Sequence, residues 1–425
     1  MMRCVGVFGF VVAGILATWM PAPGQETGSS CVACHEMLSG RLGDPAKRFA
    51  EDVHAEAGFG CPACHGGDPT IQGPAAMDEA KGYIGRPEAA QIPGICGRCH
   101  SDAGFMRQYN PALRVDQVQE YLTSVHGQRL LGAGDTAVAN CASCHGPHGI
   151  LPATDPRSPV YALNVADTCA GCHSDTARMA PYGIPTDQAE KYRRSIHWET
   201  MSEGGDMSAP TCNDCHGNHG AAPPGISWVG HVCGQCHVVM AEYFEASRHS
   251  AAFEMMGVPG CARCHQNHEI RPASDGMLGM GEEAVCVTCH RPDDVGGQGA
   301  IAMRATIDTL SGTIDSARVV LEHAEDSGVE VSSALATLND ARSSLIKART
   351  AVHAFDPEKV AADAEPGMKI AGEALVRGRQ ALGELRFRRI GLAVAVLIIG
   401  ALIVGLVLKI KEVEPSVGAT DGRDT

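Results

Sequence analysis

The chain has 425 residues, a formal net charge of −15, 19 cysteines and 19 histidines, and only 4% of its residues are aromatic. An acidic chain lacks the excess of Lys and Arg that neutralises phosphates, so the composition argues against nucleic-acid binding. The ordinary apolar fraction of 44% argues against wholesale disorder. Nineteen cysteines are too many for a typical reduced cytosolic enzyme, and so few aromatic side chains suggest that something else fills the core.

The first 24 residues have the pattern of a secretory signal peptide. Arg3 precedes an apolar run over residues 5–20, and small residues follow it. We expect cleavage after Ala22 or Gly24, with an uncleaved N-terminal anchor as the alternative. Cys4 would leave with the signal, so the mature chain would keep 18 cysteines, an even number in an exported protein.

Those 18 cysteines form nine Cys-x-x-Cys pairs, and a histidine follows each pair directly. This is the attachment signature of c-type haem, in which two thiols form thioethers to the vinyl groups and the next imidazole ligates the iron. Zinc would need four ligands per site and gives no reason for a histidine after every pair. The predicted haem-binding cysteines are Cys31, Cys34, Cys61, Cys64, Cys96, Cys99, Cys141, Cys144, Cys169, Cys172, Cys212, Cys215, Cys233, Cys236, Cys261, Cys264, Cys286 and Cys289. The predicted proximal iron ligands are His35, His65, His100, His145, His173, His216, His237, His265 and His290.

With these motifs, the segment 31–290 resembles the multihaem c-type cytochromes. The resemblance implies a compact array of covalently bound haem c groups, nine in this chain, with little regular sheet and with electron transfer as the default activity. The haems would then supply the hydrophobic core that the few aromatic side chains cannot.

The motifs after the first fall into four modules of two. A histidine with an aromatic residue at −5 and Ser or Asp at −2 precedes each module, and three modules place a histidine three residues after their first motif. In related cytochromes such positions commonly supply the distal iron ligand. The eight histidines outside the motifs in the haem region, predicted as distal ligands, are His54, His126, His148, His197, His219, His231, His249 and His268.

Nine irons face these eight spare histidines, so the sequence predicts one haem without a distal histidine. We expect it among the first three haems, because module one has Asp68 where the other modules have the second histidine. Met37, Met77 or another methionine could ligate that iron and raise its reduction potential. Alternatively its sixth position is open, which would allow a small substrate to bind.

Residues 296–388 are predicted to form a helical stalk. Apolar residues alternate by three and four in two stretches, Met303 to Ala324 and Val331 to Phe355, which is typical of packed helices. Asp356 and Pro357 would begin a third helix, which Pro366 and Gly367 could kink. The two histidines of this segment, His323 and His353, are expected to face solvent and not to ligate iron.

Residues 389–409 are predicted to be a transmembrane helix, because Ile390 to Leu408 is a run of 19 uncharged residues. The signal peptide places the haem domain, residues 25–295, outside the cytoplasm and the tail, 410–425, inside. Three arginines on the outer side against Lys409 and Lys411 inside mildly favour the opposite orientation, but large translocated domains can override that bias.

Taken together, the sequence predicts a mainly α-helical protein with extensive irregular loops, in which a multihaem array is followed by a helical bundle and one C-terminal transmembrane helix. The predicted function is electron relay on the outer face of the cytoplasmic membrane. Expected partners are the membrane itself, a quinol-oxidising membrane subunit and periplasmic cytochromes. The alternative is a reductase or oxidase of a small nitrogen or sulfur compound at one open haem. A haem-based sensor is less favoured because the predicted cytoplasmic tail is too short for an output domain.

Overall fold

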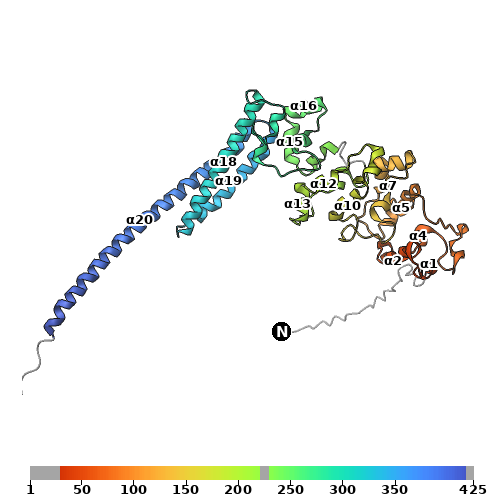
Figure 1. The fold of residues 1–425 in the computed structure, drawn as a ribbon, viewed down its shortest axis with the longest axis horizontal. Helices are drawn as coiled ribbons and strands as arrows, with labels where there is room; N and C mark the ends of the chain where they lie inside the picture. Colours follow the sequence, from red (N-terminus) through yellow and green to blue (C-terminus); the bar gives the residue numbers. More distant parts are fainter. Residues whose placement is uncertain (1–28, 221–228, 418–425) are drawn as a thin grey trace, which may run out of the picture. The chain divides into compact units, whose positions relative to one another are not determined.

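The computed structural model describes residues 29–220 and 229–417, with the side chains of 29–220 and 230–413. These residues form helices, turns and irregular loops without a strand (Figure 1), which confirms the predicted mainly α-helical class. The predicted signal peptide lies outside the described residues, and so does the second half of the predicted tail, residues 418–425. The chain divides into two compact units, Met1–Val229 and Gly230–Thr425.

The first unit is built of short helices joined by long loops. Few large side chains are fully buried in it; Leu130 and Met201 are the largest, each 1% exposed. The polypeptide of this unit therefore has only a small apolar core of its own. Its helices are α1 (Ser30–His35), η1 (Gly40–Leu42), α2 (Asp44–Phe49), α3 (Val53–Glu56), α4 (Pro62–His65), η2 (Pro74–Met77), η3 (Glu79–Lys81), η4 (Ala89–Gln91), α5 (Ile92–His100), α6 (Ala103–Met106), α7 (Gln117–Thr123), α8 (Val125–Gly127), the π-helix η5 (Gln128–Gly132), α9 (Cys141–His145), α10 (Ala162–His173), α11 (Thr176–Met179), η6 (Ala180–Tyr182), α12 (Gln188–Tyr192), α13 (Ile196–Ser202) and α14 (Cys212–His216).

The second unit combines the last three motifs with a bundle of three long helices. Its short helices are η7 (Val229–Gln235), α15 (Val238–Glu245), α16 (Arg248–Met256), α17 (Gly260–His265), η8 (Asp275–Met277) and η9 (Val285–Thr288). The bundle consists of α18 (Val295–Asp326), α19 (Ser332–Ala351), the short turn η10 (Val352–Ala354) and α20 (Pro357–Val417).

The predicted apolar stripe forms the core of the bundle. On α18 the residues from Met303 to Ala324 that recur every three or four positions are all buried, and they pack against Leu338 and Ala348 of α19 and Ala371 of α20. Small residues let the helices approach closely. At Gly367 any side chain would clash, because a Cβ there would lie only 2.7 Å from the Cβ of Ser344. The Pro366–Gly367 pair therefore lies inside one continuous helix at a close crossing with α19.

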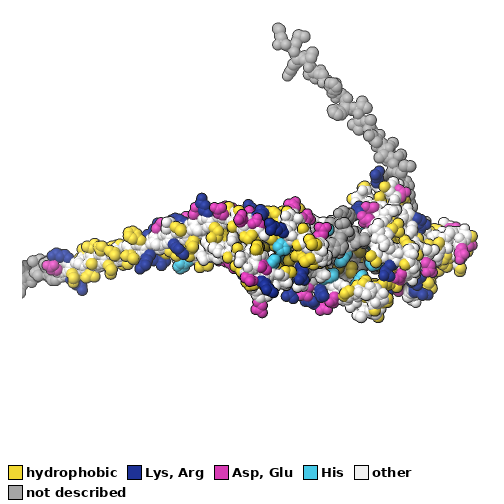
Figure 2. Space-filling view, turned by 90° about the horizontal axis from the view of Figure 1, so that it is seen from above, with side chains coloured by type: hydrophobic (Ala, Val, Ile, Leu, Met, Phe, Trp, Pro, Cys, Tyr) yellow, Lys and Arg dark blue, Asp and Glu magenta, His cyan; other side chains and the backbone are white. Residues whose placement is uncertain are grey.

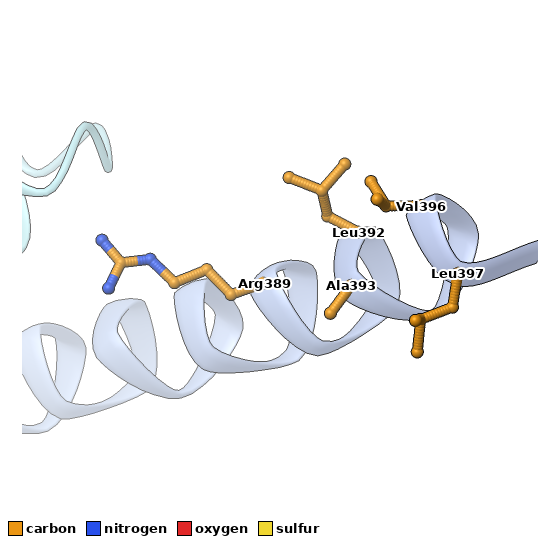
Figure 3. A pocket seen from close by; sticks show the side chains of 5 residues that line it. All are labelled: Arg389, Leu392, Ala393, Val396 and Leu397. Carbon is orange, nitrogen blue, oxygen red and sulfur yellow. The ribbon is translucent and has the colours of Figure 1, made fainter. Parts of the chain in front are cut away.

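Beyond the bundle, α20 continues as a single helix. It has 61 residues and is therefore about 90 Å long at 1.5 Å per residue. It contains one stretch that is long and apolar enough to cross a membrane, and the large side chains from Ile390 to Leu408 are exposed (Figure 2). A shallow hollow at the start of this stretch lies along one helix, between Arg389 and Leu397 (Figure 3). Exposed apolar side chains on every face of a helix are typical of contact with lipid.

Candidate haem sites

The nine motifs occupy equivalent positions at helix ends. Seven end an α-helix on the motif histidine, as in α9 and α10, while His237 and His290 follow the 3₁₀ turns η7 and η9. In a helical turn, residues three apart lie on the same face, so the two cysteines of a motif project toward one group while the histidine begins the next turn. The local structure thus places two thiols and one imidazole around a common volume.

Six motif histidines lie opposite a histidine from outside the motifs. In all six pairs the ring centres are 5.8–6.2 Å apart, although the rings range from nearly parallel to nearly perpendicular. With the motif histidine first, the pairs are His65 with His148, His100 with His54, His145 with His219, His173 with His126, His265 with His353 and His290 with His249.

This spacing fits one iron between two imidazoles. A metal–nitrogen bond of about 2 Å on each side, plus about 1.1 Å from each nitrogen to its ring centre, places the ring centres about 6.2 Å apart. Directly stacked rings would lie closer together, as His249 and Phe355 do at 3.8 Å. The donor set of two cysteines and two histidines therefore fits a covalently attached haem c with two axial histidines.

Hydrogen bonds fix which ring nitrogen is available to the metal. The Nδ1–H of His65 donates to the carbonyl of Gly85, and that of His35 to the carbonyl of Leu42, each over 2.8 Å. A carboxylate plays the same part for the Nδ1 of His290, where Asp294 accepts over 3.2 Å. Since Nδ1 holds the proton in each ring, Nε2 keeps its lone pair for a metal.

Burial also favours the neutral rings that a metal needs. It lowers the pKa of each of these nine histidines below the usual value: His100, His126, His145, His148, His173, His216, His219, His249 and His265. Removing a charged imidazolium from water is unfavourable, so these side chains are unprotonated at neutral pH and can donate a lone pair.

In three of the four copies, the residue two positions before the repeated histidine caps the helix that holds the histidine. Ser124 caps α8 by accepting from the N–H of Gly127 over 2.9 Å, and Ser195 caps α13 by accepting from Trp198 over 3.2 Å. The aromatic residue at −5 is tied down in the same way in two copies: the hydroxyls of Tyr121 and Tyr192 donate to carbonyls 18 residues further on. The aromatic residue at −5 and the Ser or Asp at −2 thus help to orient the histidine.

Asp52 takes the serine position in module one and does more than cap a helix. Its Oδ1 accepts from the backbone N–H of His54 (2.9 Å) and from the Nδ1–H of His54 (2.8 Å), and its Oδ2 accepts from the N–H of Ile150 (2.8 Å). Burial by itself would raise the pKa of Asp52, but these hydrogen bonds and the nearby His54 hold it below the usual value. One buried carboxylate therefore joins the segments that hold His54 and His148.

Successive motifs are neighbours in space. The thiols of Cys96 and Cys141 lie close enough to hydrogen bond, and so do those of Cys169 and Cys212. Thiols also come near each other between the second and third motifs, the fourth and fifth, and the eighth and ninth, while the seventh and eighth meet through Cys233 and Cys261. Motifs two to six are contiguous in the first unit, and motifs seven to nine are contiguous in the second.

The structure brings five of the eight predicted distal histidines opposite a motif histidine: His54, His126, His148, His219 and His249. For His197, His231 and His268 the role of distal ligand stays a prediction. Met37 is 79% exposed and Met77 is 40% exposed, and ligation of an iron by either methionine stays a prediction.

The expectation that both bundle histidines face solvent is wrong for one of them. His323 is exposed on α18, but His353 is half-buried and lies opposite His265. The helical periodicity continues through Val352 to Phe355 in the sequence, which hid the fact that α19 ends at Ala351 and that a turn follows.

Two comparisons with known proteins found matches. The family model for cytochrome c3 matches residues 205–291. The multiheme cytochrome MtrA of Shewanella baltica (strain OS185) is 26% identical to this chain over 222 residues. These similarities support a multihaem c-type cytochrome. The MtrA match covers 49% of the chain, which spans about half (52%) of the length of that relative. No solved structure matches the chain.

Proposed function

We propose that the chain is a membrane-anchored cytochrome with nine haem c groups that relays electrons outside the cytoplasm. The spacing of the six histidine pairs is the observation on which this proposal chiefly depends, because it repeats at motif after motif. When bound, haem c supplies an iron that alternates between two oxidation states. The chain supplies two axial imidazoles, a fixed tautomer and a desolvated surrounding.

The contiguity of the motifs supports a relay. Adjacent motifs place their thiols together in both units, so electrons would have short steps between successive haems. The leading motif is tied to module one, since the N–H of Ser30 donates to the carbonyl of Pro69 over 3.0 Å. Repeated bis-histidine sites are typical of conduction, because an iron with two protein ligands has no position for a substrate.

The apolar part of α20 supports the anchor. On this proposal the haem region lies on the outer face of the membrane and the end of α20 lies in the cytoplasm. On this proposal the electron donor is a quinol-linked membrane protein, and the acceptors are periplasmic or outer-membrane redox proteins. The similarity to a multiheme cytochrome is in line with such partners.

Haem content tests the number nine. We expect the intact mass and the haem assay of the purified chain to give nine haems, and the Cys141→Ala/Cys144→Ala variant to give eight, because thioether attachment needs both thiols of a motif. Cys4→Ser is the matched control and should leave nine. A wild-type content well below nine would contradict the proposal, as would a double variant that still has nine.

The spin state of the irons separates the relay from the enzyme alternative. We expect the electron paramagnetic resonance spectrum of the oxidised protein to show low-spin haems only, because bis-histidine ligation produces a strong ligand field. A high-spin signal that integrates to one haem in the wild-type protein would favour a reductase or oxidase with one open iron.

A further inference from the structure

The turn η10 between α19 and α20 lies beside the last haem module within the second unit. Helix α15 packs against η10 and against α19, and Tyr243 of α15 also contacts the core of the bundle. In Figure 1, α15 and α16 are drawn beside this end of the bundle. The bundle and the eighth and ninth motifs therefore share one packed region.

We propose that His353 supplies the distal ligand of the haem attached to Cys261 and Cys264. Its ring centre lies 6.1 Å from that of His265, with an interplanar angle of 21°. The stacked pairs His65–His148 and His145–His219 have nearly the same geometry, at 5.8 Å and 14° and at 6.2 Å and 9°. The inference rests on the proposed function in one respect, that the eighth motif carries a haem.

The hydrogen bonding of His353 is that of an axial ligand. Its Nδ1–H donates to the carbonyl of Thr350 over 3.0 Å, so Nε2 is the nitrogen left for the metal. His65 uses a backbone carbonyl in the same way. A histidine on a solvent-facing turn would have no reason to be held at iron-binding distance from a motif histidine.

The repeat explains why a bundle residue takes this role. His65 and His145 belong to the first motifs of modules one and two. Each pairs with a histidine from the following module, His148 or His219, which lies three residues after the first motif of that module. The motif at Cys261 begins the last module, and no further motif follows His290 in the sequence. The bundle follows in the chain instead, and His353 occupies the place that a next module would fill.

The turn is held rigidly enough to place a ligand. Arg349 forms two hydrogen bonds to the carboxylate of Asp275, over 2.6 and 2.8 Å, which joins the last turn of α19 to the loop after the eighth motif. Phe355 adopts a left-handed backbone conformation with φ 53°, which is strained for a residue other than glycine. Its ring stacks on His249 at 3.8 Å, so the same turn also supports the distal histidine of the ninth motif.

This assignment changes the histidine count. With His353 the chain has nine candidate distal histidines for nine irons, so the shortage that suggested an open haem disappears. The bundle is then part of the haem array, and its fold and the ligation of the eighth haem depend on each other.

The test is the His353→Ala variant of the full-length haem protein in detergent. We expect nine haems as in the wild type, one new high-spin ferric signal that integrates to one haem, and recovery of the low-spin spectrum when imidazole is added. His323→Ala, on the exposed face of α18, is the matched control and should leave the spectrum unchanged. His353→Met, which keeps a ligand in place, should remain low-spin with one haem shifted to a higher reduction potential.

A His353→Ala protein with nine haems and an unchanged low-spin spectrum would overturn the inference while leaving the proposed function intact. A wild-type protein without haem on the peptide that contains Cys261 and Cys264 would instead overturn the proposed function. If the alanine variant fails to accumulate, His353→Met decides: an unchanged set of reduction potentials overturns the inference, and one raised potential supports it.

Discussion

A chain that ends after Arg388 is expected to leave the membrane and be recovered in soluble form with its haems in place. The truncation removes the apolar stretch Ile390–Leu408, whose transfer into a bilayer is worth about 5–10 kcal/mol at a few tenths of a kcal/mol per residue. The buried residues of the bundle end at Ala381, so the truncation leaves the core intact. Fractionation of membranes, followed by haem staining, measures the result.

A chain that ends after Val413 is the control, because it loses only residues 414–425 and should stay in the membrane. If the Arg388 truncation also stays in the membrane, the anchor lies elsewhere, and an uncleaved N-terminal segment becomes the explanation. Soluble protein with fewer haems would contradict the independence of the haem sites from the span.

Replacing Asp52 with alanine is expected to lower the free energy of unfolding by about 3–5 kcal/mol, since it removes a buried carboxylate and leaves its hydrogen-bond donors without acceptors. Asp52 is 2% exposed and bonds to both His54 and Ile150. The loss should appear as a lower thermal unfolding midpoint of the haem protein. The reduction potential of the haem at the third motif should rise as well, because His54 loses the carboxylate that makes it a stronger donor.

Asp52→Ser is the control, because modules two, three and four have serine at this position. It should retain the cap on α3 and recover part of the stability, but not the bond to Ile150. If Asp52→Ala unfolds at the same temperature as the wild type, the link between the two histidine segments does not stabilise the fold.

The sequence by itself determined the local chemistry, because a haem attachment site is contained within five consecutive residues. The mainly α-helical class and the core positions of the bundle were also predictable, since periods of three and four residues report helical packing directly. The Ser or Asp two positions before His54, His126, His197 and His249 was visible as a repeat, although its capping role was not.

The pairing of histidines was decided only by the tertiary structure. The rings that meet, such as those of His54 and His100 or of His65 and His148, come from different segments, and nothing in the spacing of the sequence shows which will pair. Asp52 was recognisable only as a departure from serine; its bond to a residue 98 positions away depends on how the loops fold.

The clearest case is His353, which sequence periodicity placed on a helical stalk. Apolar periodicity does not show where a helix ends when the turn after it is also apolar. Val352 and Phe355 continue the apolar pattern beyond the end of α19, so the turn could not be recognised. Motif spacing thus determined that this chain holds a series of haem sites, because that information is local. Which imidazole lies opposite each motif histidine depends on long-range packing, as the contact between the bundle and the last module shows.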